Sequence, residues 1–153
     1  MSQADAHSLS GNVHPDLLIL LNETAGFYAW NRMNYGYTDE AESILNTAKS
    51  FTDNHSRGQS AKLVWSFSYL ENAFARLFGE KGEDERALEH QILSVELIRK
   101  AASMDEQNME FKRTLAVYLR NLSNTSESLM PKEEAEEYER EACEVARQLD
   151  QLD

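Results

Sequence analysis

The chain has 153 residues, of which 41% are hydrophobic, with only 6 glycines and 2 prolines; this balance favours helices joined by short loops over a strand-rich fold. Its formal net charge of −12 argues against nucleic acid and against anionic membrane surfaces as partners, since both require clustered Lys and Arg side chains. The single cysteine, Cys143, cannot form an internal disulfide, and neither a membrane span nor a secretory leader is recognisable, so we expect a cytoplasmic protein.

Residues 1–13 mix small and polar types without periodicity and predict a flexible tail. The helical domain is expected over residues 14–153. Pro15 suits the first position of a helix that should continue to about Tyr35, where Gly36 ends it. A second helix is predicted from Glu40 to Phe51, capped by Thr38 or Asp39.

The polar stretch 52–59 predicts a loop, and Ser60 can cap a third helix that reaches Phe78 and is closed by Gly79. This helix carries two neighbouring apolar flanks, so it should pack on two sides and form the centre of the protein. The residues of these flanks are Leu63, Phe67, Leu70, Phe74 and Leu77, and Trp65, Tyr69 and Ala73.

A fourth helix is predicted over about 84–103, followed by a fifth that begins near 104–108, because Ser103 and Glu106 have the spacing of a capping box. After a polar loop at 123–128, Pro131 should open a sixth helix that continues to about Leu149. We expect these helices to form three antiparallel hairpins, at about 15–51, 60–103 and 106–150.

An internal repeat links the second helix of each hairpin. Pairs of small residues seven positions apart recur 46 and then 48 residues along the chain, and small side chains at such positions let two helices approach closely. The pairs are Ala41 with Ala48, Ala87 with Ser94, and Ala135 with Ala142.

The first hairpin resembles the tetratricopeptide (TPR) family through Ala29, Gly36, Ala41, Leu45 and Ala48, and through the turn Tyr35–Ala41. The last hairpin resembles it through Leu115, Ala116 and Leu119, and then through residues 134–138 to Ala142. The middle hairpin departs from the pattern, because Ser94 replaces the second alanine and the turn is extended. The repeat also exceeds the usual length of about 34 residues, as in elongated variants. The resemblance implies a short right-handed solenoid.

Catalytic and metal-binding motifs are not recognisable. The four histidines, His7, His14, His55 and His90, are scattered, and no HExxH or Cys/His cluster offers metal-ligand spacing. A phospho-accepting role for His90 is a weaker interpretation, because the expected surrounding sequence pattern is absent. A reactive thiol at Cys143 is also a weaker interpretation, since Cys143 is expected to be a small buried residue. The acidic residues 133–144 are read as a solvated helix face. We therefore expect no enzyme activity, no cofactor and no metal.

The TPR resemblance implies a binding groove lined by the first helix of each hairpin, whereas most of the acidic residues fall on the second helices. Trp30 and Val117 stand where the family's carboxylate-clamp subclass would have polar contacts, which argues against binding of chaperone tails. The expected partner is a protein or peptide with apolar anchors and an acidic group, which would bind Arg113 and Arg120. The residues expected to face this groove are Glu23, Phe27, Trp30, Met33, Asn34, Arg113, Val117, Arg120 and Asn121.

Other interpretations remain open. The aromatic residues of the first helix could be core and the arginines merely solubilising. A plain six-helix bundle is the alternative fold. The chain could also be a self-associating module, as a homodimer or as a fragment of a longer repeat array, or a sensor of a small ligand or signalling peptide. A dimeric mass would favour the self-associating module, and a closed, aromatic-lined pocket would favour the sensor.

Overall fold

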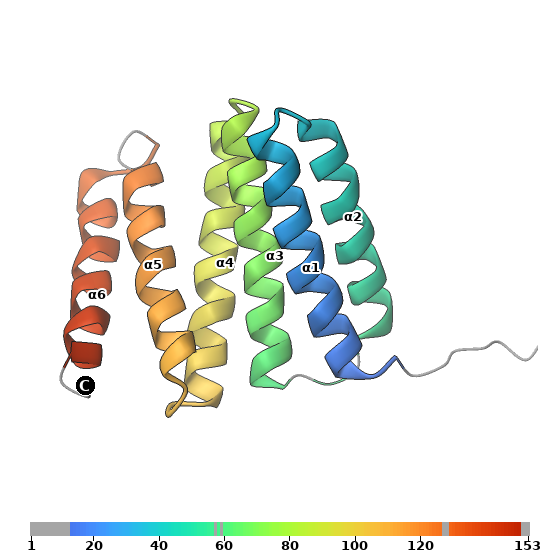
Figure 1. Cartoon of the computed structure of the whole chain (residues 1–153). Helices are drawn as coiled ribbons and strands as arrows, with labels where there is room; N and C mark the ends of the chain where they lie inside the picture. Colours follow the sequence, from blue (N-terminus) through green and yellow to red (C-terminus); the bar gives the residue numbers. More distant parts are fainter. Residues whose placement is uncertain (1–12, 57, 59, 127–128, 151–153) are drawn as a thin grey trace, which may run out of the picture.

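The computed structural model describes residues 13–56, 58, 60–126 and 129–150, and within these ranges all regular structure is α-helical. This confirms the all-α prediction. Consecutive helices run in opposite directions along the array (Figure 1). The six helices are α1 (Pro15–Asn34), α2 (Thr38–His55), α3 (Ala61–Glu80), α4 (Asp84–Met104), α5 (Met109–Ser126) and α6 (Lys132–Asp150). The predicted tail, except Val13, lies outside the described residues.

The turns after α1 and α3 are built alike. Gly36 and Gly82 each adopt a positive φ, 80° and 73°, in the left-handed region that only glycine enters without strain. Each is followed by a backbone N–H that bonds five residues back, from Tyr37 to Arg32 and from Glu83 to Phe78, as in a Schellman motif. The prediction that Gly79 ends the third helix is therefore wrong, because Gly79 is helical and Gly82 makes the turn. The α3–α4 turn is also no longer than the first.

The second helix is one turn longer than predicted and ends at His55. Thr52, placed in a loop by its polar surroundings, is fully buried, and its hydroxyl lies 2.8 Å from both the Ala48 carbonyl and the Asn22 side-chain oxygen. Asn22 also donates to Ser66 at 3.0 Å. Three polar side chains from α1, α2 and α3 thus satisfy one another in the core, and this tertiary contact extends the helix.

The predicted capping box before the fifth helix is absent. Ser103 lies inside α4 and bonds the Lys100 carbonyl, whereas the Asn108 side chain accepts the N–H groups of Glu110 and Phe111. The helix starts at Met109 because Asn108 satisfies its first free amides.

The expected loop after α5 also begins later than predicted. Residues 123–126 continue the helix, and the hydroxyl of Ser123 bonds the Ala135 carbonyl on α6. As with Thr52, a polar residue near a helix end is held in the core by a partner on a neighbouring helix.

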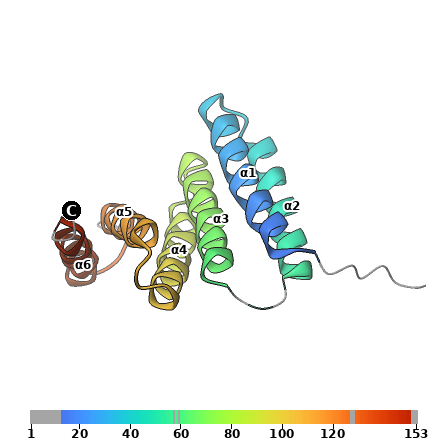
Figure 2. The same cartoon turned by 60° about the horizontal axis from the view of Figure 1, so that its bottom comes forward.

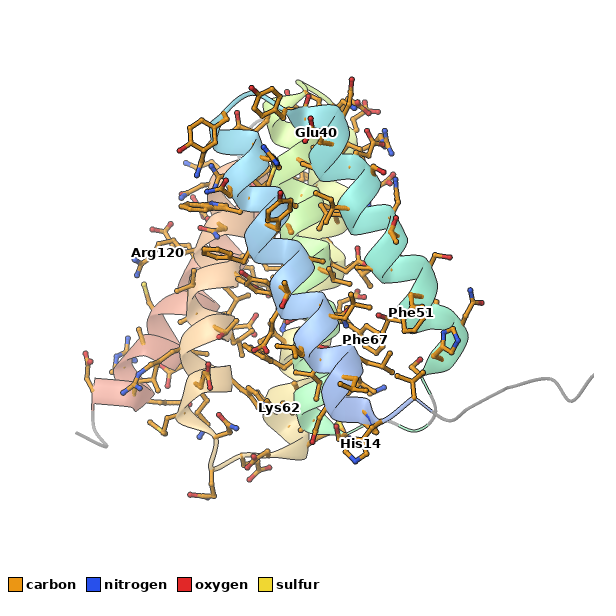
Figure 3. All side chains as sticks on the ribbon, turned by 45° about the vertical axis from the view of Figure 1, so that its right-hand side comes forward. His14, Glu40, Phe51, Lys62, Phe67 and Arg120 are labelled. Carbon is orange, nitrogen blue, oxygen red and sulfur yellow. The ribbon has the colours of Figure 1, made fainter. Side chains whose placement is uncertain are left out.

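The third helix is the centre of packing, as predicted. It contacts α1, α2 and α4 along its length, and its Trp65 ring stacks on Phe111 of α5 with centroids 6.1 Å apart. Phe67 projects from it beside the lower half of α1 (Figure 3). The α5–α6 pair joins the rest mainly through α4 (Figure 2).

All six small residues of the predicted repeat are buried, none more than 4% exposed. Within the described part of the chain, no helix is long and apolar enough to cross a lipid bilayer.

Candidate functional site

A groove of about 1070 Å³ runs over the C-terminal halves of α1, α3 and α5, with the start of α4 at one side. It is open to solvent and not an enclosed pocket. The residues that line it are Gly26, Phe27 and Trp30; Tyr69, Asn72, Ala73, Ala75, Arg76, Gly79 and Glu80; Asp84, Ala87 and Gln91; and Asn121, Asn124 and Thr125.

The α1 side of the groove is aromatic. Phe27 is 63% exposed and Trp30 is 46% exposed, although both lie on a helix whose other face is packed in the core. The Arg76 guanidinium lies over the Trp30 ring, 4.9 Å from its centroid, and donates to the Asn34 side-chain oxygen at 2.8 Å. These contacts connect α1 to α3 across the groove and hold the indole in place.

The floor of the groove depends on a glycine inside a helix. A Cβ on Gly26 would lie 2.8 Å from Cδ1 of Tyr69, so the bare backbone of α1 makes room for the Tyr69 ring. The pKa of Tyr69 is raised, first by burial and then by the negative charge of Glu23.

The side of the groove opposite α1 presents amides. Gln91 of α4 is 6% exposed and donates to the side-chain oxygen of Asn72 on α3 at 3.2 Å. Asn121 and Asn124 of α5 are exposed on the side of the groove across from α1. A carboxamide can donate and accept at once, which suits it to contact with the backbone of an extended peptide.

The predicted site residues divide into four groups. Phe27, Trp30 and Asn121 line the groove. Asn34 lies at its edge, bonded to Arg76, while Met33 is 5% exposed and belongs to the core. Arg113, Val117 and Arg120 are exposed on α5 but do not line this groove, and Arg120 projects outward from the helix (Figure 3).

The third helix, α3, supplies the residues that sequence reasoning missed. Tyr69, Asn72 and Arg76 of α3 lie between the predicted α1 and α5 residues. Their 3–4 spacing along the helix is one signal in the sequence. The presence of Gly26 within a helical pattern is another: glycine destabilises a helix interior by about 1 kcal/mol relative to alanine, so its presence there suggests a close packing contact.

A second cluster of ionisable groups lies away from the groove. Glu71 of α3, with its side chain only 3% exposed, accepts from Lys49 of α2 at 2.9 Å and from Nδ1 of His90 on α4 at 2.6 Å. Burial by itself would raise the pKa of Glu71, but the hydrogen bonds from His90 and Lys49 outweigh it and lower the pKa. His90 also stacks on Phe74 and Phe78, so the cluster joins three helices in the core.

Two chemical interpretations can be compared with the structure. Cys143 is exposed on α6, so the expectation that it is buried is wrong: it faces solvent next to the buried Ala142. Among the described residues, no group of three or more His, Cys, Asp or Glu side chains could hold a metal ion.

Comparison of the chain with protein-family models, with curated proteins and with solved structures found no match.

Proposed function

We propose that the chain is a TPR-like solenoid of three helical hairpins that binds an extended peptide in the groove across α1, α3 and α5, without catalysis. Two features support the repeat interpretation. The turn glycines Gly36 and Gly82 are 46 residues apart, the same offset as between Ala41 and Ala87. In both turns the glycine N–H bonds three residues back and the N–H of the next residue bonds five residues back.

The observation that carries the binding proposal is the exposed aromatic pair beside a row of amides. Exposed aromatic side chains such as Phe27 and Trp30 contribute most of the affinity at a peptide-binding surface when the peptide covers them and removes them from water. The amides of Asn72, Asn121 and Asn124 are placed to hydrogen-bond a peptide backbone. An open groove of about 1070 Å³ that is lined by four helices suits a peptide better than a small molecule.

The test is selection of random dodecapeptides displayed on phage, using the immobilised protein as bait. A Phe27→Ser/Trp30→Ser variant removes the aromatic side of the groove. Leu17→Ser/Leu20→Ser is the matched control, since it alters two residues of α1 that are 60% and 58% exposed but lie outside the groove. Circular dichroism should show the same helicity for all three proteins.

Peptides that bind the wild type and the control but not the groove variant are expected. If every selected peptide binds the groove variant as tightly as the wild type, the groove is not the binding site and the proposal fails.

A second candidate function is self-association, favoured by the exposure of Leu17 and Leu20 on α1. Paired helices of two copies would bury both residues. Sedimentation equilibrium should then show a dimer that the Leu17→Ser/Leu20→Ser variant converts to a monomer. A monomeric wild-type protein at high concentration would eliminate this candidate.

A further inference from the structure

We propose that the peptide bound in this groove is basic as well as apolar: a Lys or Arg side chain lies against Glu80 and Asp84, next to an aromatic or aliphatic anchor on Phe27 and Trp30. This inference rests on the proposed function. It differs from the acidic partner expected from Arg113 and Arg120, because neither arginine lines the groove.

The charged residues that line the groove are Arg76, Glu80 and Asp84, which leaves an excess of negative charge. Arg76 has its partners within the protein: it lies over Trp30, donates to Asn34 and lies 3.7 Å from a carboxylate oxygen of Glu80. An acidic ligand would have to compete with these contacts. A cation would instead meet carboxylates that are solvent-exposed on either side of the α3–α4 turn.

The position of Glu80 is unfavourable for the helix that carries it. It is the last residue of α3, where the helix macrodipole is negative and disfavours a carboxylate. Its side chain is 49% exposed and its contact with Arg76 is long, so it contributes little to stability. Asp84, as the first residue of α4, is favourable for its helix and adds a second negative charge close by along the chain.

The rest of the protein strengthens this polarity. The chain carries a net charge of −12, which attracts a basic peptide from a distance and repels an acidic one. The groove adds specificity by placing the carboxylates at one end and the aromatic pair on α1. Arg76 contacts both Trp30 and Glu80, so a peptide with a cation and an apolar residue a few positions apart would reach the carboxylates and the aromatic pair at once.

The experiment reads the sequences of the peptides from the phage selection and then measures the affinity of the best synthetic peptide by calorimetry. A Glu80→Gln/Asp84→Asn variant neutralises the two groove carboxylates. The matched control is Glu137→Gln/Glu139→Gln, which removes two exposed negative charges from α6, away from the groove. Both variants change the net charge equally, so long-range attraction is the same in both.

We expect Lys or Arg to be enriched beside aromatic or aliphatic residues in peptides that need Phe27 and Trp30. At low salt, the groove variant should weaken binding about twofold to fivefold more than the control, and high salt should reduce the difference. Enrichment of Asp or Glu, or equal losses in both variants, would overturn the inference while leaving peptide binding intact. Peptides indifferent to Phe27 and Trp30 would overturn the proposed function as well.

Discussion

The ring of Tyr69 on α3 occupies the space that a side chain at Gly26 on α1 would fill. Glycine in the middle of a helix costs about 1 kcal/mol relative to alanine, so this close approach is a structural reason for the residue. Gly26 and Tyr69 both line the groove, so their contact forms part of its surface.

This relationship predicts a non-additive pair of substitutions. Gly26→Ala should force the Tyr69 ring to move and gain little or no stability, despite the better helix propensity of alanine. In a Tyr69→Ala background the same change should stabilise the protein by about 0.5–1 kcal/mol. Urea unfolding of the two single variants and the double variant measures the coupling. Equal effects of Gly26→Ala in both backgrounds would mean that the ring does not constrain this position.

The buried polar cluster around Asn22 predicts that a charged side chain at this position would lower the stability of the protein. Asn22 is 0% exposed and bonds Ser66 and Thr52. Asn22→Asp should lower the free energy of unfolding at pH 7 by roughly 3–5 kcal/mol, because it buries a carboxylate without a cation. Asn22→Leu should cost about 1–2 kcal/mol, since the Ser66 and Thr52 hydroxyls also lie within hydrogen-bond distance of backbone carbonyls.

Acidification separates the two Asn22 variants. Burial raises the pKa of a carboxyl group, so the penalty in Asn22→Asp should shrink as the pH falls towards the unfolded-state pKa of about 3.9. The stability difference between Asn22→Asp and Asn22→Leu, followed by denaturant unfolding at several pH values, should narrow on the acid side. A difference that stays constant with pH would show that burial does not shift the pKa of this aspartate between the folded and unfolded states.

The lowered pKa of Glu71 predicts a second pH dependence. Because the pKa is lower in the folded state than in the unfolded state, ionised Glu71 stabilises the protein above the unfolded value of about 4.3. This contribution is lost as the pH falls through the folded-state pKa. Glu71→Gln should therefore cost about 1.5–3 kcal/mol at pH 7 and much less at low pH.

A control for Glu71 is available on the surface. Glu96 is exposed on the neighbouring helix α4, and Glu96→Gln should change stability by less than about 0.5 kcal/mol at any pH. If Glu71→Gln and Glu96→Gln have the same unfolding free energy at neutral pH, the bonds from Lys49 and His90 do not stabilise the fold.

The repeated small residues predict intolerance to larger side chains. Ala48 is 2% exposed between α1 and α2, and Ala48→Leu should destabilise the protein by about 1–3 kcal/mol through overpacking. Asn46→Leu places the same side chain on the exposed face of α2 and should be nearly neutral. Thermal unfolding of both variants provides the comparison, and similar melting temperatures would argue against close helix approach at Ala48.

Helix identity and most helix ends could be predicted because they depend on local interactions. Pro15, Gly36, Ser60 and Pro131 act through backbone geometry or a nearby hydrogen bond, and the 3–4 spacing of apolar residues marks the buried faces. The C-terminal ends of α2 and α5, which were predicted too early, depend on distant residues. Thr52 is helical because Asn22, thirty positions away, accepts its hydroxyl, and no local pattern reveals that contact.

The candidate groove shows the same division. The TPR resemblance singled out Phe27, Trp30 and Asn121 from the sequence, and these three residues line the groove. Arg113 and Arg120 could not be placed, because their location depends on how α5 turns against α4 and not on their spacing along α5. The part of α3 that completes the groove was overlooked because α3 was read only as core.

The helical character of this protein, the apolar faces of its helices and their interruption by glycine and proline follow from the amino-acid sequence, because these properties arise from interactions within a few residues. Helix packing determines which polar side chains are buried together, which aromatic residues remain exposed and which charges share the groove. Those outcomes depend on contacts between helices, and a contact such as that of Gly26 with Tyr69 exists only once the helices have packed.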